Sequence, residues 1–113
     1  MPATAKPSLR FFHSKELRQR TQTLLDAIDA AKDATPHRAA LAELVVDLSE
    51  AGLGYYYLEP LQLAKAGFVV EQSASLTVSG ALRVLAPMTR TVIGRLDHKQ
   101  LRVVGRFLRS LMA

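Results

Sequence analysis

The first apolar pattern along the chain has helical spacing. Apolar or small residues recur at every third or fourth position: Leu17, Thr21, Leu24, Ile28 and Ala31. Ser14 precedes this run, and serine is one of the residues that cap helix N-termini. The pattern therefore predicts a helix that begins after Ser14 and ends near Ala34.

A second helix is expected directly after the first. Thr35 and Pro36 form a typical restart, because proline at the first helical position has no N–H to leave unpaired. Gly52 is a suitable C-terminal stop for this helix. Its buried face is formed by Leu41, Leu44, Val45 and Leu48. Because the connection is short, the two helices should form an antiparallel hairpin.

The region from Pro60 to Gly94 is apolar around nearly the whole circumference of a helix. One face consists of Leu63, Gly67, Val70, Ala74, Val78, Ala81, Leu85, Met88 and Val92. Further apolar residues lie elsewhere around it: Leu76, Leu82, Val84, Ala86 and Ile93. Such a helix is buried, either in the core of its own domain or in an oligomer interface. Gly80 and Pro87 both disfavour a helix interior, so residues 60–94 form either one kinked helix or two helices.

A strand pair is the alternative for part of this region. Leu76, Val78, Leu82 and Val84 also alternate with period two, and β-branched residues are frequent. We favour a helix over residues 76–84, because the three–four spacing extends further and no hairpin turn dipeptide occurs.

A last amphipathic helix is expected from Asp97 to about Met112. Asp97 can cap it, and Gln100 completes a variant of the capping box. Its apolar stripe is Leu101, Val104, Leu108 and Leu111, flanked by Val103, Phe107 and Met112. Its other side carries an arc of five cations, which we call the basic arc: Arg95, Lys99, Arg102, Arg106 and Arg109.

These patterns together predict an all-α fold. We expect a small four- or five-helix bundle with an antiparallel hairpin in its N-terminal half. A kinked central apolar helix and a basic amphipathic C-terminal helix complete it. Residues 1–13 are expected to be a flexible N-terminal tail, and residues 14–113 a single domain.

The charge is distributed unevenly along the chain, whose net charge is +5. Residues 1–67 contain eight basic and eight acidic residues, whereas residues 68–113 contain seven basic and two acidic ones. The excess charge in the last two-fifths points to an anionic partner. The chain has no cysteine, no apolar segment long enough to span a bilayer and no signal-peptide pattern, so we expect a cytoplasmic protein.

The polar residues do not form a recognisable catalytic pattern. Acidic rows occur on the outer faces of the first two helices: Asp26, Asp29, Asp33, Glu43, Asp47 and Glu50. No Glu-x-x-His pair or glycine-rich phosphate loop accompanies them, and the three histidines are dispersed. We therefore expect no enzyme activity, metal site, cofactor or small-molecule substrate. The acidic rows do complement the basic arc, either in a neighbouring chain or in an acidic protein partner.

The apolar central region leads us to expect a non-catalytic interaction or assembly protein that forms a homo-oligomer. A first alternative is a nucleic-acid-associated protein that binds phosphates through the basic arc. A second is a protein that binds an anionic membrane or granule surface through the last helix. The basic arc would be only a solvated outer face if none of these partners binds there.

Overall fold

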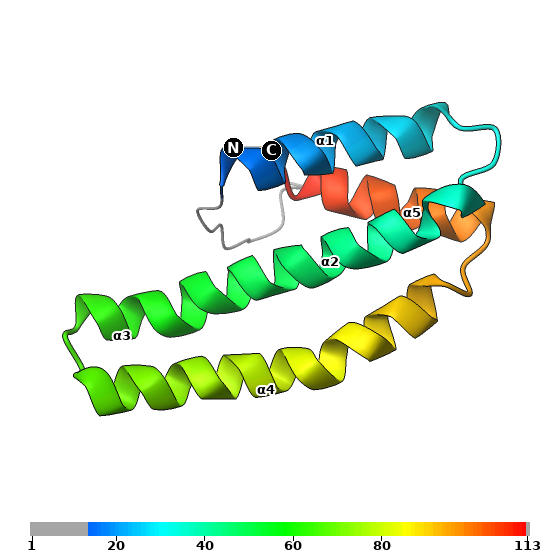
Figure 1. The fold of residues 1–113 in the computed structure, drawn as a ribbon. Helices are drawn as coiled ribbons and strands as arrows, with labels where there is room; N and C mark the ends of the chain where they lie inside the picture. The colour runs from blue at the N-terminus through cyan, green and yellow to red at the C-terminus, as the bar shows by residue number, and fades with distance from the viewer. Residues whose placement is uncertain (1–13, 113) are drawn as a thin grey trace, which may run out of the picture.

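The computed structural model describes residues 14–112, and the predicted tail at residues 1–13 lies outside these residues. Between 14 and 112 the chain consists of helices joined by short connections (Figure 1). The α-helices are α1 (Lys15–Ala30), α2 (Arg38–Leu53), α3 (Glu59–Leu63), α4 (Phe68–Ile93) and α5 (His98–Ser110). A 3-10 turn, η1 (Thr35–His37), and a π-helical turn, η2 (Gly54–Leu58), join some of them. The all-α prediction is confirmed, and no strand occurs in this part of the chain, residues 76–84 included.

The start of α1 agrees with the prediction, but its end does not. The Ser14 hydroxyl accepts a hydrogen bond from the Leu17 N–H at 3.1 Å, as expected of an N-cap. The helix ends at Ala30, four residues earlier than predicted. Asp33 accepts hydrogen bonds from both the N–H and the hydroxyl of Thr35, at 3.1 and 2.8 Å. Ala31 is already extended, and these bonds shape the turn that follows α1 and leads into η1.

The predicted stop at Gly52 is wrong. Gly52 lies inside α2, and the chain continues through η2 into α3 without leaving helical conformation. A glycine inside a helix costs only about 1 kcal/mol relative to alanine, and packing of η2 against α4 offsets that cost. The helical segment that begins with α2 therefore extends to Leu63, well beyond the predicted stop.

The break in the apolar region falls at Lys65–Gly67 rather than at Gly80 or Pro87. Lys65 and Gly67 have φ values of 52° and 102°, which reverse the chain between α3 and α4. Gly67 was predicted within the helical face but is the N-cap of α4. Residues 60–94 therefore form two helices, and α4 continues through Gly80 and Pro87. Pro87 is exposed, so water can reach the carbonyl that loses its helical partner.

The start of α5 confirms the predicted capping box. Asp97 Oδ1 accepts from the Gln100 N–H at 2.8 Å, and the Gln100 side chain accepts from the Asp97 N–H at 2.9 Å. Two side chains then tie the α5 entry to the connection between α1 and α2. His98 Nδ1 accepts from the Ala34 N–H at 2.9 Å, and Arg38 Nε donates to the Leu96 carbonyl at 2.7 Å.

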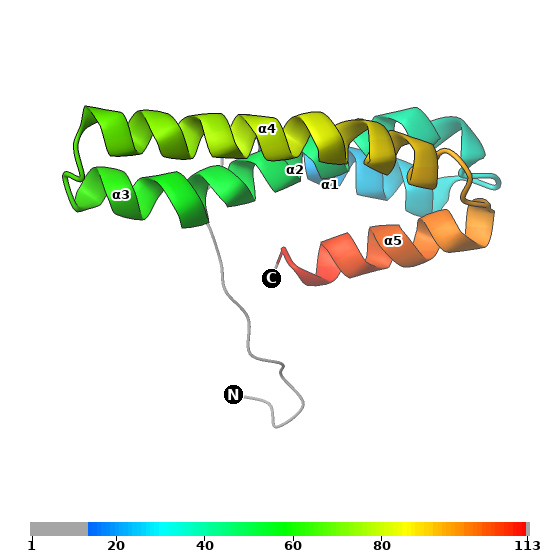
Figure 2. The same cartoon turned by 90° about the horizontal axis from the view of Figure 1, so that it is seen from below.

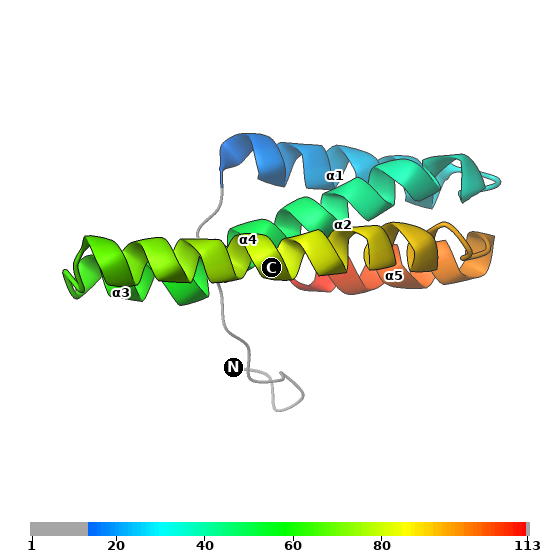
Figure 3. The same cartoon turned by 60° about the horizontal axis from the view of Figure 1, so that its bottom comes forward.

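The helices pack mainly as two pairs, α1 with α5 and α2 with α4. The core lies where these pairs meet, and its fully or nearly fully buried members are Ile28, Ala34, Leu41, Ala42, Leu44, Ile93 and Leu101. Figures 1 and 3 show that α3 and the first half of α4 extend beyond the ends of α1 and α5. The core therefore occupies one end of the molecule, and the other end is a two-helix projection.

The predicted central position of the apolar helix is not observed. Only Ala74, Val78 and Ile93 are buried in α4. The helix lies at the edge of the fold, because α2 covers one of its sides and the connection at 94–97 leads α5 away from it (Figure 2). No described helix is long and apolar enough to cross a membrane.

Candidate interaction surface

Exposed apolar side chains are concentrated in the second half of the chain. Within residues 14–112, none of the large apolar side chains before Tyr56 is exposed. Most of the exposed ones belong to α4: Phe68, Val69, Val70, Leu76, Val84, Leu85, Met88 and Val92. A soluble chain seldom exposes so many large apolar side chains on one helix unless something else covers them.

One row along α4 combines exposure with regular spacing. We call this row the α4 seam: Val70, Ala74, Thr77, Ala81, Leu85, Met88 and Val92. The spacings are four, three, four, four, three and four, so the row follows one side of the helix. Met88 and Val92 are each 59% exposed, and Ala74 is the one buried member. The row has no charged residue.

A second exposed row lies on α5. We call it the α5 stripe: Val103, Phe107 and Leu111, spaced by four, with exposures of 59%, 61% and 59%. Of the predicted inner stripe, Leu101 is buried, and Val104 and Leu108 pack against the core. Leu111 was expected on that inner stripe but is exposed.

The α4 seam and the α5 stripe lie on the same side of the molecule. Arg90 bonds Glu43 of α2, and Met88 is two residues or about 200° away, so the seam is on the opposite flank of α4. On α2, Leu41 faces the core that α5 shares, and Glu43 is two residues or about 200° away from it. Glu43 and its partner Arg90 are therefore on the side away from α5. The seam therefore faces the side on which α5 lies.

The α5 stripe is oriented by the same kind of argument. Arg109 bonds Asp26 of α1, and Phe107 is two residues away, which places Phe107 on the side of α5 away from α1. Figure 2 shows that α4 and α5 diverge from the connection between them. Both apolar rows thus border the side on which these two helices separate.

The structure divides the basic arc into three groups. Arg109 Nη2 donates to Asp26 Oδ1 at 2.8 Å and to Asp29 Oδ2 at 3.3 Å. Arg102 is half-buried, and its Nε has no hydrogen-bond partner among the described residues. The other three are exposed, with no carboxylate bonded to them in residues 14–112: Arg95, Lys99 and Arg106.

The acidic rows find basic partners within the same chain. Besides the contact of α1 with Arg109, Asp47 pairs with Arg20, and Glu43 accepts from Arg90 Nε at 2.6 Å. The hydrogen bond from Arg90 lowers the pKa of Glu43, and the same bond raises the pKa of Arg90. The hydrogen bonds from Thr35 lower the pKa of Asp33. These intrachain contacts use carboxylates that were expected to be available to a neighbouring chain.

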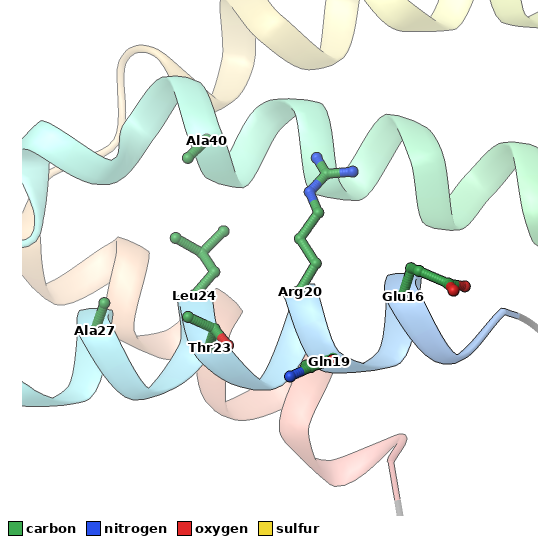
Figure 4. Close-up of a pocket in the computed structure, with 7 residues that line it drawn as sticks. All are labelled: Glu16, Gln19, Arg20, Thr23, Leu24, Ala27 and Ala40. Carbon is green, nitrogen blue, oxygen red and sulfur yellow. The ribbon is translucent and has the colours of Figure 1, made fainter.

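A hollow of about 520 Å³ lies between α1 and α2 (Figure 4). Arg20 and Leu24 point from α1 toward α2, and Ala40 points back from α2. The Arg20 guanidinium is paired with Asp47, so this cation is already neutralised. The remaining polar lining is Glu16, Gln19 and Thr23, which are all exposed, and no hydrogen bond joins Glu16 to Thr23 within the described residues. These side chains form no nucleophile–base pair of the kind that catalysis requires.

The sequence identified every member of the two rows except Thr77 as apolar, but it did not show which of them would be exposed. The spacing of four in the α5 stripe was the available signal. Periodicity defines the faces of a helix, whereas the neighbouring helices decide which face is covered. No family model, curated protein or solved structure matches this chain.

Proposed function

We propose that this chain is a non-catalytic assembly protein that self-associates through the α4 seam and the α5 stripe. The observation that carries the proposal is the exposure of large apolar side chains along α4. Each square ångström of apolar surface removed from water contributes about 25 cal/mol, so covering these side chains favours association.

The charge distribution is compatible with self-association. A chain with a net charge of +5 repels its copies unless the contact avoids the cations. The seam has no charged residue, and Arg109, within the basic arc, faces α1 rather than the α5 stripe. Two copies can therefore meet through the seam while their exposed cations remain in water.

A pair of variants tests this proposal. Met88→Glu adds one negative charge on the seam, and Gln72→Glu adds the same charge at an exposed position of α4 off the seam. Light scattering coupled to size exclusion should show that the parent and Gln72→Glu are oligomeric. Met88→Glu should dissociate at least ten times more readily, because its carboxylate would have to be desolvated. A monomeric parent, or equal behaviour of both variants, would overturn the proposal.

A second candidate function rests on the three exposed members of the basic arc. Arg95, Lys99 and Arg106 have no bonded carboxylate in the described part of the chain. We propose a phosphate-bearing partner, with nucleic acid as the first choice, bound through these three cations. Replacing all three with alanine should weaken binding to a nucleic-acid duplex and reduce its salt dependence, whereas Lys15→Ala should not.

Anionic vesicles provide the comparison for this second candidate. Binding to vesicles but not to the duplex would assign the cations to a membrane or granule surface instead. No binding to either would leave the basic arc as a solvated face and remove the second candidate.

A further inference from the structure

The α4 seam is symmetric in spacing about Ala81. Thr77 and Leu85 lie four residues from it on either side, and Ala74 and Met88 lie seven residues away. Val70 and Val92 complete the series at eleven residues on either side. A row with this symmetry reads the same in both chain directions, so two antiparallel copies of it stay in register along their whole length.

We infer that two copies of this chain form an isologous dimer in which α4 pairs antiparallel with α4 of the partner, with the two-fold axis beside Ala81. The inference rests on the proposed self-association and specifies its geometry. In a two-fold contact each residue meets the one at the equal distance on the other side of the axis. The seam then closes on itself and leaves no second half to recruit a third chain.

The sizes of the side chains favour the antiparallel direction. Leu85 of one copy lies opposite the smaller Thr77 of the other, and Met88 lies over the position of Ala74, which its own chain already covers. The two largest side chains of the seam therefore do not meet their own copies, and the two valines, Val70 and Val92, face each other. A parallel pair would place Leu85 against Leu85 and Met88 against Met88, and the small residues would face each other across a gap.

The middle of α4 allows the two helices to approach closely. Ala81 lies on the axis, and Gly80 lies beside it, with nothing within 4 Å of the position that a Cβ would take. On one edge of the seam the adjacent positions are uncharged: Ser73, Val84 and Thr91. Glu71 borders the other edge, where the two-fold axis places it against Thr91 of the second copy, and Arg83 and Arg90 lie on the far side of α4. No like charges are therefore brought together by the contact.

The α4 seam alone is smaller than a stable interface, so the proposed dimer also requires the α5 stripe. From Val70 to Val92 the seam is about 33 Å long, and a helix about 10 Å wide gives a footprint of about 330 Å². A stable interface usually buries about 800 Å² on each partner. Phe107 and Leu111, which border the same side as the seam, supply further apolar area to the dimer.

The absence of cysteine from the chain makes site-specific cross-linking a direct test. Ala81→Cys should cross-link to itself with a short bis-maleimide, because the two copies of residue 81 meet at the axis. Val70→Cys and Val92→Cys should each fail to cross-link alone but should cross-link when the two variants are mixed. Gln72→Cys, which is exposed on α4 off the seam, is the control and should stay uncross-linked.

Each outcome of this experiment has a defined meaning. Self-cross-linking of Val70→Cys and of Val92→Cys would show a parallel pair and overturn the antiparallel geometry. A dimer of the expected mass without cross-linking at any seam position would place the contact elsewhere and also overturn it. In the first case self-association through the seam stands, in the second the chain self-associates but not through the seam, and a monomeric parent chain would remove both proposals together. Circular dichroism of each variant confirms that the helices remain folded.

Discussion

Arg109 Nη2 of α5 donates to Asp26 Oδ1 of α1 at 2.8 Å, across 83 residues of sequence. The same nitrogen also reaches Asp29 Oδ2 at 3.3 Å. The cation that ends the basic arc thus joins the first helix to the last. Arg109 is therefore bonded within the chain, and at most four of the five cations of the basic arc can bind an anionic partner.

Arg109→Ala should loosen the pairing of α1 with α5. We expect amide hydrogen exchange in the second half of α1 to become faster, because Asp26 and Asp29 lose their common partner. Arg106→Ala removes an equal charge from an exposed position with no bonded carboxylate among the described residues, and should leave this exchange unchanged. Equal exchange in both variants would contradict the assigned role of Arg109.

Leu101 and Val103 test the two sides of α5. Leu101 is fully buried in the core, so Leu101→Ala should lower the free energy of unfolding by about 2–5 kcal/mol. Val103 is 59% exposed, and Val103→Ala should change it by less than about 0.5 kcal/mol. Chemical denaturation of both variants in the Met88→Glu background, which we expect to be dissociated, measures both without a contribution from the proposed interface. A similar loss in the two variants would mean that the assigned inner and outer sides of α5 are wrong.

Gly105 offers a variant that should stabilise the chain. A Cβ at this position would lie 3.6 Å from Leu25 Cδ2 and 3.7 Å from Ile28 Cγ2, which is ordinary contact. Gly105→Ala should therefore raise the free energy of unfolding by up to about 1 kcal/mol, the difference in helix propensity.

Gly105→Leu is the matched variant at the same position and should destabilise the chain. Its larger side chain would overlap Leu25 and Ile28, and overpacking of this kind costs about 1–3 kcal/mol. Thermal melts distinguish the two. A stabilised leucine variant, or a destabilised alanine variant, would contradict the close packing of α5 on α1.

Glu43 should make stability depend on pH in acid. Its pKa in the folded chain is lowered by the hydrogen bond from Arg90, so the folded state favours the carboxylate. This contribution is present above the ordinary glutamate pKa and is lost as the pH falls through the lower folded value, that is, below about pH 4. Glu43→Gln should flatten that part of the stability curve.

The control for Glu43 is another glutamate of α2. Glu50 is exposed and has no ion pair in residues 14–112, so Glu50→Gln should leave the acid part of the curve close to that of the parent. An unchanged curve for Glu43→Gln would mean that the pair with Arg90 does not persist in solution.

The sequence predicted local features better than the arrangement of helices. The caps at Ser14 and Asp97 depend on side chains within three residues, and both were found where they were expected. Gly52 was expected to stop a helix but lies inside α2, and the break considered at Gly80 or Pro87 falls at Lys65–Gly67 instead. The preference of Gly52 and Pro87 for ending a helix is outweighed by packing and by exposure to water.

The candidate surface was harder to predict for a related reason. The sequence showed that α4 is apolar around most of its circumference from Val70 to Val92. It did not show whether these residues are buried in the core of the chain or in an interface between chains. Only the structure shows that the sides of α4 away from α2 remain uncovered. The acidic rows were likewise recognised, but their pairing with Arg20, Arg90 and Arg109 depends on how the helices meet.

The molar mass of the parent chain in solution tests the central claim most directly. Sedimentation equilibrium over a range of micromolar concentrations should give twice the chain mass of 12.4 kDa, with Met88→Glu shifted toward the single-chain value. A parent chain that stays at 12.4 kDa throughout would contradict the account, because the α4 seam would then remain exposed to water.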